Sequence, residues 1–247
     1  MDDAGVVVPR RNVPVVTATD SVAADGVRIR VRPWRGRDDT AECLAAPAGA
    51  LVPPSLVRSA VERARERGFS LAVTPALPPY EWQPYVEAGF EIRERLHLLA
   101  HLLLDLPPKG EHRHRRATRR DTDAVLAVDH LAFQPFWRLD RAGLEEAIRA
   151  TPSYRFRVGR DAPSYALVGR AGDRGYVQRL AVHPDHQGHG LGRTLVLDGL
   201  WWLRRWRVRE VLVNTQQGND RAVGLYERLG FQHRPGGLAV LQADLSS

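Results

Sequence analysis

The sequence is poor in residue types that several classes of protein depend on. Among its 247 residues there is one cysteine, Cys43, which excludes an intrachain disulfide and a cysteine-rich zinc site and agrees with a reducing compartment. The longest apolar stretch, residues 96–106, contains two histidines and an aspartate and is too short to cross a bilayer. The first residues lack a positively charged leader. We therefore expect a cytoplasmic protein with no membrane partner.

Lysine is almost absent, and the positive charge comes from arginine. Lys109 is the only lysine among 36 basic residues, and the net charge is +7. Such a charge attracts polyanions. The arginines are nevertheless spread along the chain, apart from a run in residues 113–120, and no nucleic-acid-binding motif accompanies them. We do not expect a nucleic-acid partner.

Proline, glycine and periodicity divide the chain. Residues 1–26 lack sustained periodicity and predict a flexible tail. The run Pro-Pro-Lys-Gly at residues 107–110 predicts a linker over residues 107–111. Two folded parts are expected on either side of it, at residues 27–106 and 112–247.

The two parts resemble each other at a constant offset of 141 residues. A helical run (56–67, against 191–207) precedes a short apolar strand (71–73, against 211–213) in both, and this shared order indicates a duplication. The matched residues are Thr74, Tyr85, Gly89, Phe90 and Arg93 against Thr215, Tyr226, Gly230, Phe231 and Arg234.

The C-terminal part alternates strands and helices, which indicates an α/β fold. Strands are expected near residues 113–117, 155–158, 165–168, 176–182, 211–215, 231–234 and 238–245. Helices are expected at residues 124–131, 140–150, 189–207 and 220–229.

A glycine-rich turn, Gln-Gly-His-Gly-Leu-Gly at residues 187–192, joins a strand to a helix. The unpaired N–H groups and positive dipole of a helix N-terminus suit a phosphate. A dinucleotide fingerprint fails here because Arg193 occupies its last glycine, and a mononucleotide phosphate loop fails because the glycines are one residue too close. The counterpart at residues 46–51 has one glycine and a proline, so we expect no anion site in the N-terminal part.

The turn fits a third pattern, Q/R-x-x-G-x-G/A, through Gln187, Gly190 and Gly192. With the upstream strand at residues 180–184 and the downstream blocks at residues 214–219 and 225–231, the chain resembles the GNAT superfamily of acyl-CoA-dependent N-acetyltransferases over residues 112–247. This resemblance implies a GNAT-type mixed, mostly antiparallel sheet flanked by helices, preceded by a degenerate GNAT-like half-domain.

The resemblance also implies acetyl-CoA as co-substrate and roles for particular residues. Tyr226 would be the general acid that protonates the leaving thiolate. The cofactor-binding residues would be Leu180, Val182, Gln187, Gly188, His189, Gly190, Leu191, Gly192, Arg193 and Asn219, with backbone amides around the turn holding the diphosphate. Asn219 is equally well explained as a helix N-cap. Tyr226 could instead be a core residue.

The general base is where the sequence departs from the family pattern. Tyr176, Gln178 and Asn214 occupy the positions where relatives often have a base, and none of them is a good base near neutral pH. We expect these three residues to hold a water that relays the proton, or else a base supplied elsewhere, such as Asp129 or His130.

An aromatic segment and a histidine triplet each carry two interpretations. Phe133, Phe136 and Trp137 fall where the family lines its acceptor site, but they could instead pack against the N-terminal part. Glu145 and Glu146 could attract a cationic amine, although solvation on a helix explains them better. His183, His186 and His189 lie around a proline-containing loop and share no face, so we expect no metal.

Together these features predict an N-acetyltransferase that moves acetyl from acetyl-CoA to a primary amine by direct attack in a ternary complex. The acceptor would be an amine-bearing small molecule or peptide. Because a base is missing, a non-catalytic acyl-CoA-binding or regulatory module is the alternative. The sequence leaves a homodimer open.

Overall fold

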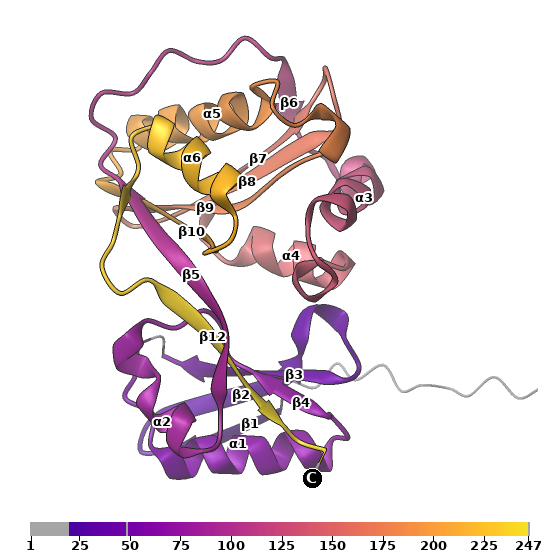
Figure 1. Cartoon of the computed structure of the whole chain (residues 1–247), viewed down its shortest axis with the longest axis vertical. Coiled ribbons are helices and arrows are strands. Elements are labelled where there is room, and N and C mark those ends of the chain that lie inside the picture. Colours follow the sequence, from indigo (N-terminus) through magenta and orange to yellow (C-terminus); the bar gives the residue numbers. More distant parts are fainter. Residues whose placement is uncertain (1–19, 48, 247) are drawn as a thin grey trace, which may run out of the picture.

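A computed structural model describes residues 20–47 and 49–246 as two lobes joined by long strands (Figure 1). The strands form one twelve-stranded sheet in the order β1-β2-β3-β4-β12-β5-β10-β9-β8-β7-β6, with β11 paired to β5. Among the strand pairs of the described residues, only β3–β4 and β9–β10 are parallel. The predicted α/β class, with a mixed and mostly antiparallel sheet flanked by helices, is confirmed.

The lower lobe is built from the first part of the chain. Its elements are β1 (Asp20–Ala24), β2 (Val27–Pro33), η1 (Trp34–Gly36), β3 (Thr40–Ala46), α1 (Pro54–Glu66), β4 (Leu71–Val73), η2 (Pro79–Glu81) and α2 (Gln83–Glu87). The tail expected at residues 1–26 is corrected here, because residues 20–24 form β1; residues 1–19 lie outside the described part. The apolar side of α1 packs on the sheet, with Leu56, Val57 and Ala60 buried.

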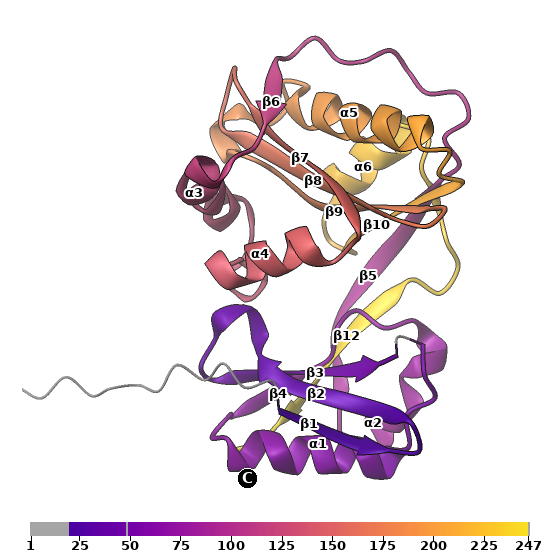
Figure 2. The ribbon, with the colours of Figure 1, turned by 180° about the vertical axis from the view of Figure 1, so that it is seen from behind.

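The upper lobe contains most of the second part. Its elements are β6 (His114–Arg116), η3 (Arg119–Asp121), α3 (Thr122–Ala132), η4 (Pro135–Trp137), α4 (Arg141–Arg149), β7 (Ser153–Gly159), β8 (Ser164–Ala171), β9 (Arg174–Val182), η5 (Pro184–His186), α5 (Leu191–Arg205), β10 (Glu210–Gln216), α6 (Asp220–Arg228) and β11 (Gln232–His233). Helices α3 and α4 cover one face of this part of the sheet, and α5 and α6 cover the other (Figures 1 and 2). No helix among the described residues is long and apolar enough to traverse a membrane.

Two strands cross between the lobes. β5 (Glu91–His101) pairs with β10 along its second half and with β12 (Leu238–Asp244) along its first half. β12 in turn pairs with β4, so the last strand of the chain lies inside the lower lobe. Ala239, Leu241 and Ala243 of β12 are buried in the same core as α1. Each lobe is therefore completed by a strand from the other part of the chain.

The duplicated blocks share a local structure. In both, the tyrosine carbonyl accepts a hydrogen bond from the phenylalanine five residues later, Tyr85 from Phe90 and Tyr226 from Phe231, each 3.0 Å long. The intervening glycine has a φ of +91° in the first block and +92° in the second. The two aromatic rings lie edge to face, with centroids 5.5 Å and 5.4 Å apart. The offset of 141 residues thus corresponds to a repeated local structure, in which a helix ends in a glycine turn that leads into a strand.

Candidate active site

The glycine turn forms the entry to α5. Gly190 caps this helix with a φ of +82°, a left-handed conformation that a Cβ disfavours. The first bond of the helix runs from the Thr194 amide to the Gly190 carbonyl, at 3.0 Å. Within the described residues, the backbone N–H groups of residues 188–193 have no hydrogen-bond acceptor. These donors lie at the positive end of the helix dipole and are available to an anion.

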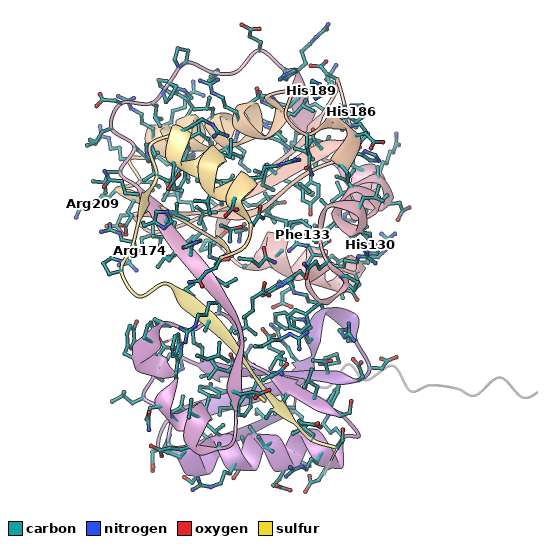
Figure 3. The ribbon with its side chains drawn as sticks, viewed as in Figure 1. His130, Phe133, Arg174, His186, His189 and Arg209 are labelled. Atoms are coloured by element: carbon teal, nitrogen blue, oxygen red, sulfur yellow. The ribbon has the colours of Figure 1, made fainter. Side chains whose placement is uncertain are left out.

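Gln187 fixes this turn to its neighbours. Its side-chain amide donates to the Val182 carbonyl at 3.0 Å, so it ties the turn to the end of β9. Its side-chain oxygen accepts a hydrogen bond from Arg221 of α6. Figure 3 shows His186 and His189 at this end of α5, whereas Arg174 and Arg209 lie at the opposite end of β9. Gln187 thus positions the turn through its side chain, and its role in cofactor binding remains a prediction.

Strands β9 and β10 separate beside the turn. They pair only through Arg174, Gly175 and Tyr176 on β9, and residues 177–182 of β9 have no partner on that side among the described residues. Leu180 and Val182 lie on this open edge, while their side chains face α5 near Gly192. An extended chain of amides can add to such an edge as a strand does. The gap leads from the glycine turn toward Gln178.

Gln178 occupies a β-bulge at the start of the open edge. The pairing with β8 shifts register between Arg179 and Val177, which leaves Gln178 unpaired between them. Its side-chain amide donates to the Ala147 carbonyl of α4 at 3.1 Å, so this side chain lies on the α4 face of the sheet.

Tyr176 and Asn214 lie on the same face as Gln178. Tyr176 is paired with Gly169, where a Cβ would meet the side chains of Thr151 and Gln178, and paired residues share a face. Asn214 is exposed and alternates with Val213, which is buried on the α5 side. The structure therefore brings the three predicted relay residues to one face, although their role stays a prediction.

Tyr226 is buried beside Phe231, with 5% of its surface exposed. Its structural twin, Tyr85, is 1% exposed, and the Tyr85 hydroxyl is sealed from solvent without a partner. The Tyr226 hydroxyl also has no partner among the described residues, but it is not sealed. Burial raises the pKa of Tyr226 above its ordinary value, which keeps the phenol protonated as a general acid requires.

Asn219 caps α6. Its side-chain oxygen accepts a hydrogen bond from the Ala222 amide at 3.1 Å, the bond expected of an N-cap residue. Its amide nitrogen is left for another partner, so capping and a contact with the cofactor are compatible. The structure shows the first role, and the second stays a prediction.

Asp129 is engaged in a buried network. The side chain is 0% exposed and accepts hydrogen bonds from Arg179 at 2.7 Å and 2.9 Å, from the Tyr165 hydroxyl at 2.5 Å and from the Leu139 amide at 2.8 Å. His130 contacts the Leu139 carbonyl at 2.8 Å. With its carboxylate held by these donors, Asp129 is poorly placed to accept a proton from a substrate, and we do not retain it as a base.

The aromatic segment at η4 packs against the lower lobe. Phe136 stacks on Trp34 with ring centroids 5.2 Å apart, and the Trp137 indole donates to Glu94 of β5 at 2.7 Å. Phe133 lies under the Arg179 guanidinium, 3.5 Å from its centre to the ring centroid. These contacts are those expected if the aromatic segment packs against the N-terminal part of the chain. The predicted role of Phe133, Phe136 and Trp137 in substrate binding stays a prediction. His130 and Phe133 are both near the end of α3 (Figure 3).

Sequence reasoning missed the charged residues that the lower lobe contributes. Arg32 of β2 pairs with Glu42 of β3 and with Glu146 of α4, each at 2.5 Å. Glu146 is exposed, as expected, and its pair with Arg32 also joins the two lobes. The alternation Val-Arg-Ile-Arg-Val-Arg in residues 27–32 could have indicated a strand with a charged face. The alternation alone does not indicate which residues pair with the charged face of this strand.

Part of the chain is similar in sequence to curated acetyltransferases. The chain is 51% identical over 57 residues to a mycothiol acetyltransferase from Geodermatophilus obscurus, which covers 23% of this chain and 18% of that protein. It is 31% identical over 129 residues to a mycothiol acetyltransferase from Actinosynnema mirum, which covers 45% and 41%. The chain thus matches less than half the length of these curated relatives.

A solved structure has a similar fold over most of the chain. A GCN5-related N-acetyltransferase from Kribbella flavida superposes with a TM-score of 0.64 and 20% identity, covering 93% of this chain and 91% of that one. The model of the acetyltransferase (GNAT) family matches residues 126–231, which include the glycine turn, the open edge of β9 and Tyr226. Residues 126–231 thus form a domain of the acetyltransferase (GNAT) family.

Proposed function

We propose that the protein transfers an acetyl group from acetyl-CoA to a primary amine by direct attack in a ternary complex. One observation carries this proposal: free backbone donors at the α5 N-terminus lie beside the open edge of β9. The backbone donors suit a diphosphate, and the open strand edge suits an extended chain of amides. Coenzyme A combines both groups in one molecule.

The binding residues follow from these two features. Amides of residues 188–193 would hold the diphosphate, and the backbone of Leu180 and Val182 would bind the pantetheine amides. Asn219 would contact the same arm through its free amide nitrogen. The thioester would then lie toward Gln178, where the gap between β9 and β10 begins.

The reaction needs two proton transfers. The amine nitrogen forms a bond to the acetyl carbon as the carbon–sulfur bond breaks. The amine loses its proton to a water held by Tyr176, Gln178 or Asn214, and the thiolate takes the phenolic proton of Tyr226. A positioned amine needs little more than the correct orientation, so the absence of a good base among Tyr176, Gln178 and Asn214 is compatible with turnover.

Calorimetry of acetyl-CoA binding tests the cofactor site. Gly190→Ala would place a Cβ at a φ of +82°, which a residue with a Cβ disfavours. The turn would relax to relieve this strain, and the backbone amides of residues 188–193 would then no longer converge on the diphosphate. Loss of one hydrogen bond to a charged group corresponds to about a tenfold or greater loss of affinity. Gly172→Ala is a matched control, because Gly172 has a φ of +59° in the β8–β9 turn with no neighbour within 4 Å. Equal affinities in the two variants would contradict the site.

Release of free thiol tests turnover. A panel of amino acids, polyamines, aminoglycosides and peptides should contain at least one acceptor that releases coenzyme A faster than the amine-free control. Tight binding without turnover on any acceptor would instead support the non-catalytic acyl-CoA-binding module. The relatives are named mycothiol acetyltransferases, but the chain covers less than half of them, and we do not carry their acceptor over.

A further inference from the structure

A cavity of about 190 Å³ lies between the two lobes. The lower lobe lines it with Arg32, Arg35 and Glu42, and the upper lobe lines it with Glu146, Gln178 and Arg179. Because liquid water occupies about 30 Å³ per molecule, this volume corresponds to about six waters. The cavity is thus of a size to hold a small polar molecule.

Most charges around the cavity are matched. Arg32 pairs with Glu42 and Glu146, and Arg179 pairs with Asp129 at 2.7 Å. Arg35 differs from the other two arginines, since no carboxylate of the described residues lies within 4 Å of it. One of its terminal nitrogens donates to the Trp137 carbonyl at 3.2 Å. The cavity wall therefore contains one guanidinium without an anionic partner.

Arg35 and Gln178 each have an unsatisfied polar atom. The Nε of Arg35 and the side-chain oxygen of Gln178 are both hidden from solvent and have no hydrogen-bond partner among the described residues. One atom is a donor and the other an acceptor. A buried polar group without a partner is unfavourable, and a ligand that accepts from Arg35 and donates to Gln178 would satisfy both after small side-chain movements.

The backbone holds Arg35 in place. Its φ is +50°, which is rare for a residue with a Cβ and is found where surrounding structure enforces it. Its neighbour Gly36 contacts Asp140 so closely that a Cβ there would lie 2.0 Å from the carboxylate. The guanidinium lies over the rings of Trp34 and Trp137, 4.7 Å and 5.5 Å from their centroids. The backbone of Arg35 is therefore fixed at the lobe interface, and its guanidinium lies between two indole rings.

Burial, and next the positive charge of Arg179, lower the pKa of Arg35 to about 10, although the more distant carboxylates of Glu42, Asp129 and Glu146 act to raise it. The guanidinium remains charged at neutral pH. An anion beside it would offset both effects.

Gln178 connects the cavity to the reaction. It lines the cavity and is also the bulge residue at the start of the open β9 edge. A small acceptor bound to both side chains would thus have one end on Arg35 and its other end at the apex of the gap between β9 and β10.

We propose that this cavity is the acceptor site and that the acceptor is a small amine bearing a carboxylate, with the carboxylate bound by Arg35 and the amine near the Gln178 side-chain oxygen. The inference rests on the acetyl transfer proposed above, and it names the acceptor as an amino acid with a free carboxylate.

Matched substrates test this inference in the wild-type protein. Free L-amino acids and the corresponding amino acid amides present the same amine, with and without the carboxylate. We expect kcat/KM for acetylation to be at least about tenfold higher for the acids, the ratio expected for a charged hydrogen bond. Equal rates for acids and amides, or acetylation of only polyamines or aminoglycosides, would overturn the inference and leave acetyl transfer intact.

Variants of Arg35 locate the preference. Arg35→Gln should reduce the ratio of acid to amide to within about twofold, while Arg35→Lys, which keeps the charge, should retain part of it. Arg37→Gln is the control, because Arg37 lies in the same segment, pairs with Asp39 and does not line the cavity. A preference unchanged in Arg35→Gln would assign the carboxylate to another site.

A thermal-shift measurement does not depend on turnover. Millimolar L-amino acids should raise the melting temperature of the acetyl-CoA-bound wild type and of Arg37→Gln, but not that of Arg35→Gln. If acetyl-CoA binds and no amino acid stabilises the wild type, the inference fails. If acetyl-CoA itself does not bind, the proposed function fails first.

Discussion

Replacement of Asp129 by asparagine should strongly destabilise the protein. The carboxylate accepts from Arg179, Tyr165 and the Leu139 amide. Asparagine has the same shape but turns an amide N–H₂ toward donors that need an acceptor. The Arg179 guanidinium, itself only 9% exposed, would lose its counter-charge. Removing one partner of a buried ion pair costs about 3–5 kcal/mol.

That cost is large against the typical stability of a domain, about 5–15 kcal/mol. It would also loosen the loop between α3 and α4, because Arg179 donates to the Trp137 carbonyl at 2.7 Å. Urea unfolding, followed by tryptophan fluorescence and circular dichroism, gives the free energy of unfolding. The transition of Asp129→Asn should move to much lower urea concentration.

Asp123→Asn on the same helix is the control. The Asp123 side chain is 86% exposed and pairs with Arg141 at 2.6 Å, and exposed pairs contribute about 0–1 kcal/mol. If Asp129→Asn cost no more than Asp123→Asn, the assignment of Asp129 to a structural network would be refuted, and a role as a base would need to be reconsidered.

Three further predictions concern groups elsewhere in the molecule. Tyr226→Phe should lower kcat by about a hundredfold, the usual contribution of a general acid, while its affinity for acetyl-CoA stays within about twofold of the wild type. The control is Tyr85→Phe, at the equivalent position of the lower lobe, which should leave kcat unchanged. Equal effects of the two substitutions on kcat would contradict the role of Tyr226 as general acid. Burial acts to raise the pKa of Asp198, but the hydrogen bonds and charge of Arg155 outweigh it and lower the pKa to about 2. Because the folded pKa lies below the ordinary value of 3.8, this stabilisation is present above about pH 4 and is lost as the pH falls toward 2; acid unfolding of Asp198→Asn should lack this component. Cys43 is fully buried, and burial raises the pKa of its thiol to about 12, so a thiol reagent should label the chain only after unfolding, and labelling of the native protein would contradict its burial.

Local signals predicted the upper lobe well. Asp140 was expected to open a helix, and its carboxylate indeed accepts from the Gly143 amide at 2.6 Å ahead of α4. The strand expected at residues 176–182 is β9, and the helix expected at residues 189–207 is α5. In these segments caps, glycines and periodicity act within a few residues, which is why the sequence alone reveals them.

The lower lobe was harder to predict because its strands are stabilised by pairing with segments that are distant in the sequence. β1 falls inside the expected tail, and β5 begins with the charged run Glu-Ile-Arg-Glu-Arg, which has no regular apolar face. β5 is a strand because its first half pairs with β12 and its second half pairs with β10.

The same reason limited prediction of the site. The glycine turn was singled out by a local pattern and Tyr226 through the family resemblance, and the roles of both stay predictions. The proximity of Arg35 to Gln178 could not be predicted, because these residues come from different lobes. Only the crossing strands and the contacts of η1 with α4 bring them to one cavity.

The position of β12 has a consequence for biosynthesis. The lower lobe is translated first, but the strand between β4 and β5 is not available until residues 238–244 have left the ribosome. Until then β4 and β5 present open edges that can pair with other chains. Completion of the lower lobe must therefore wait for residues 238–244, and a chain stalled before residue 238 would expose an unfinished sheet to aggregation and proteolysis.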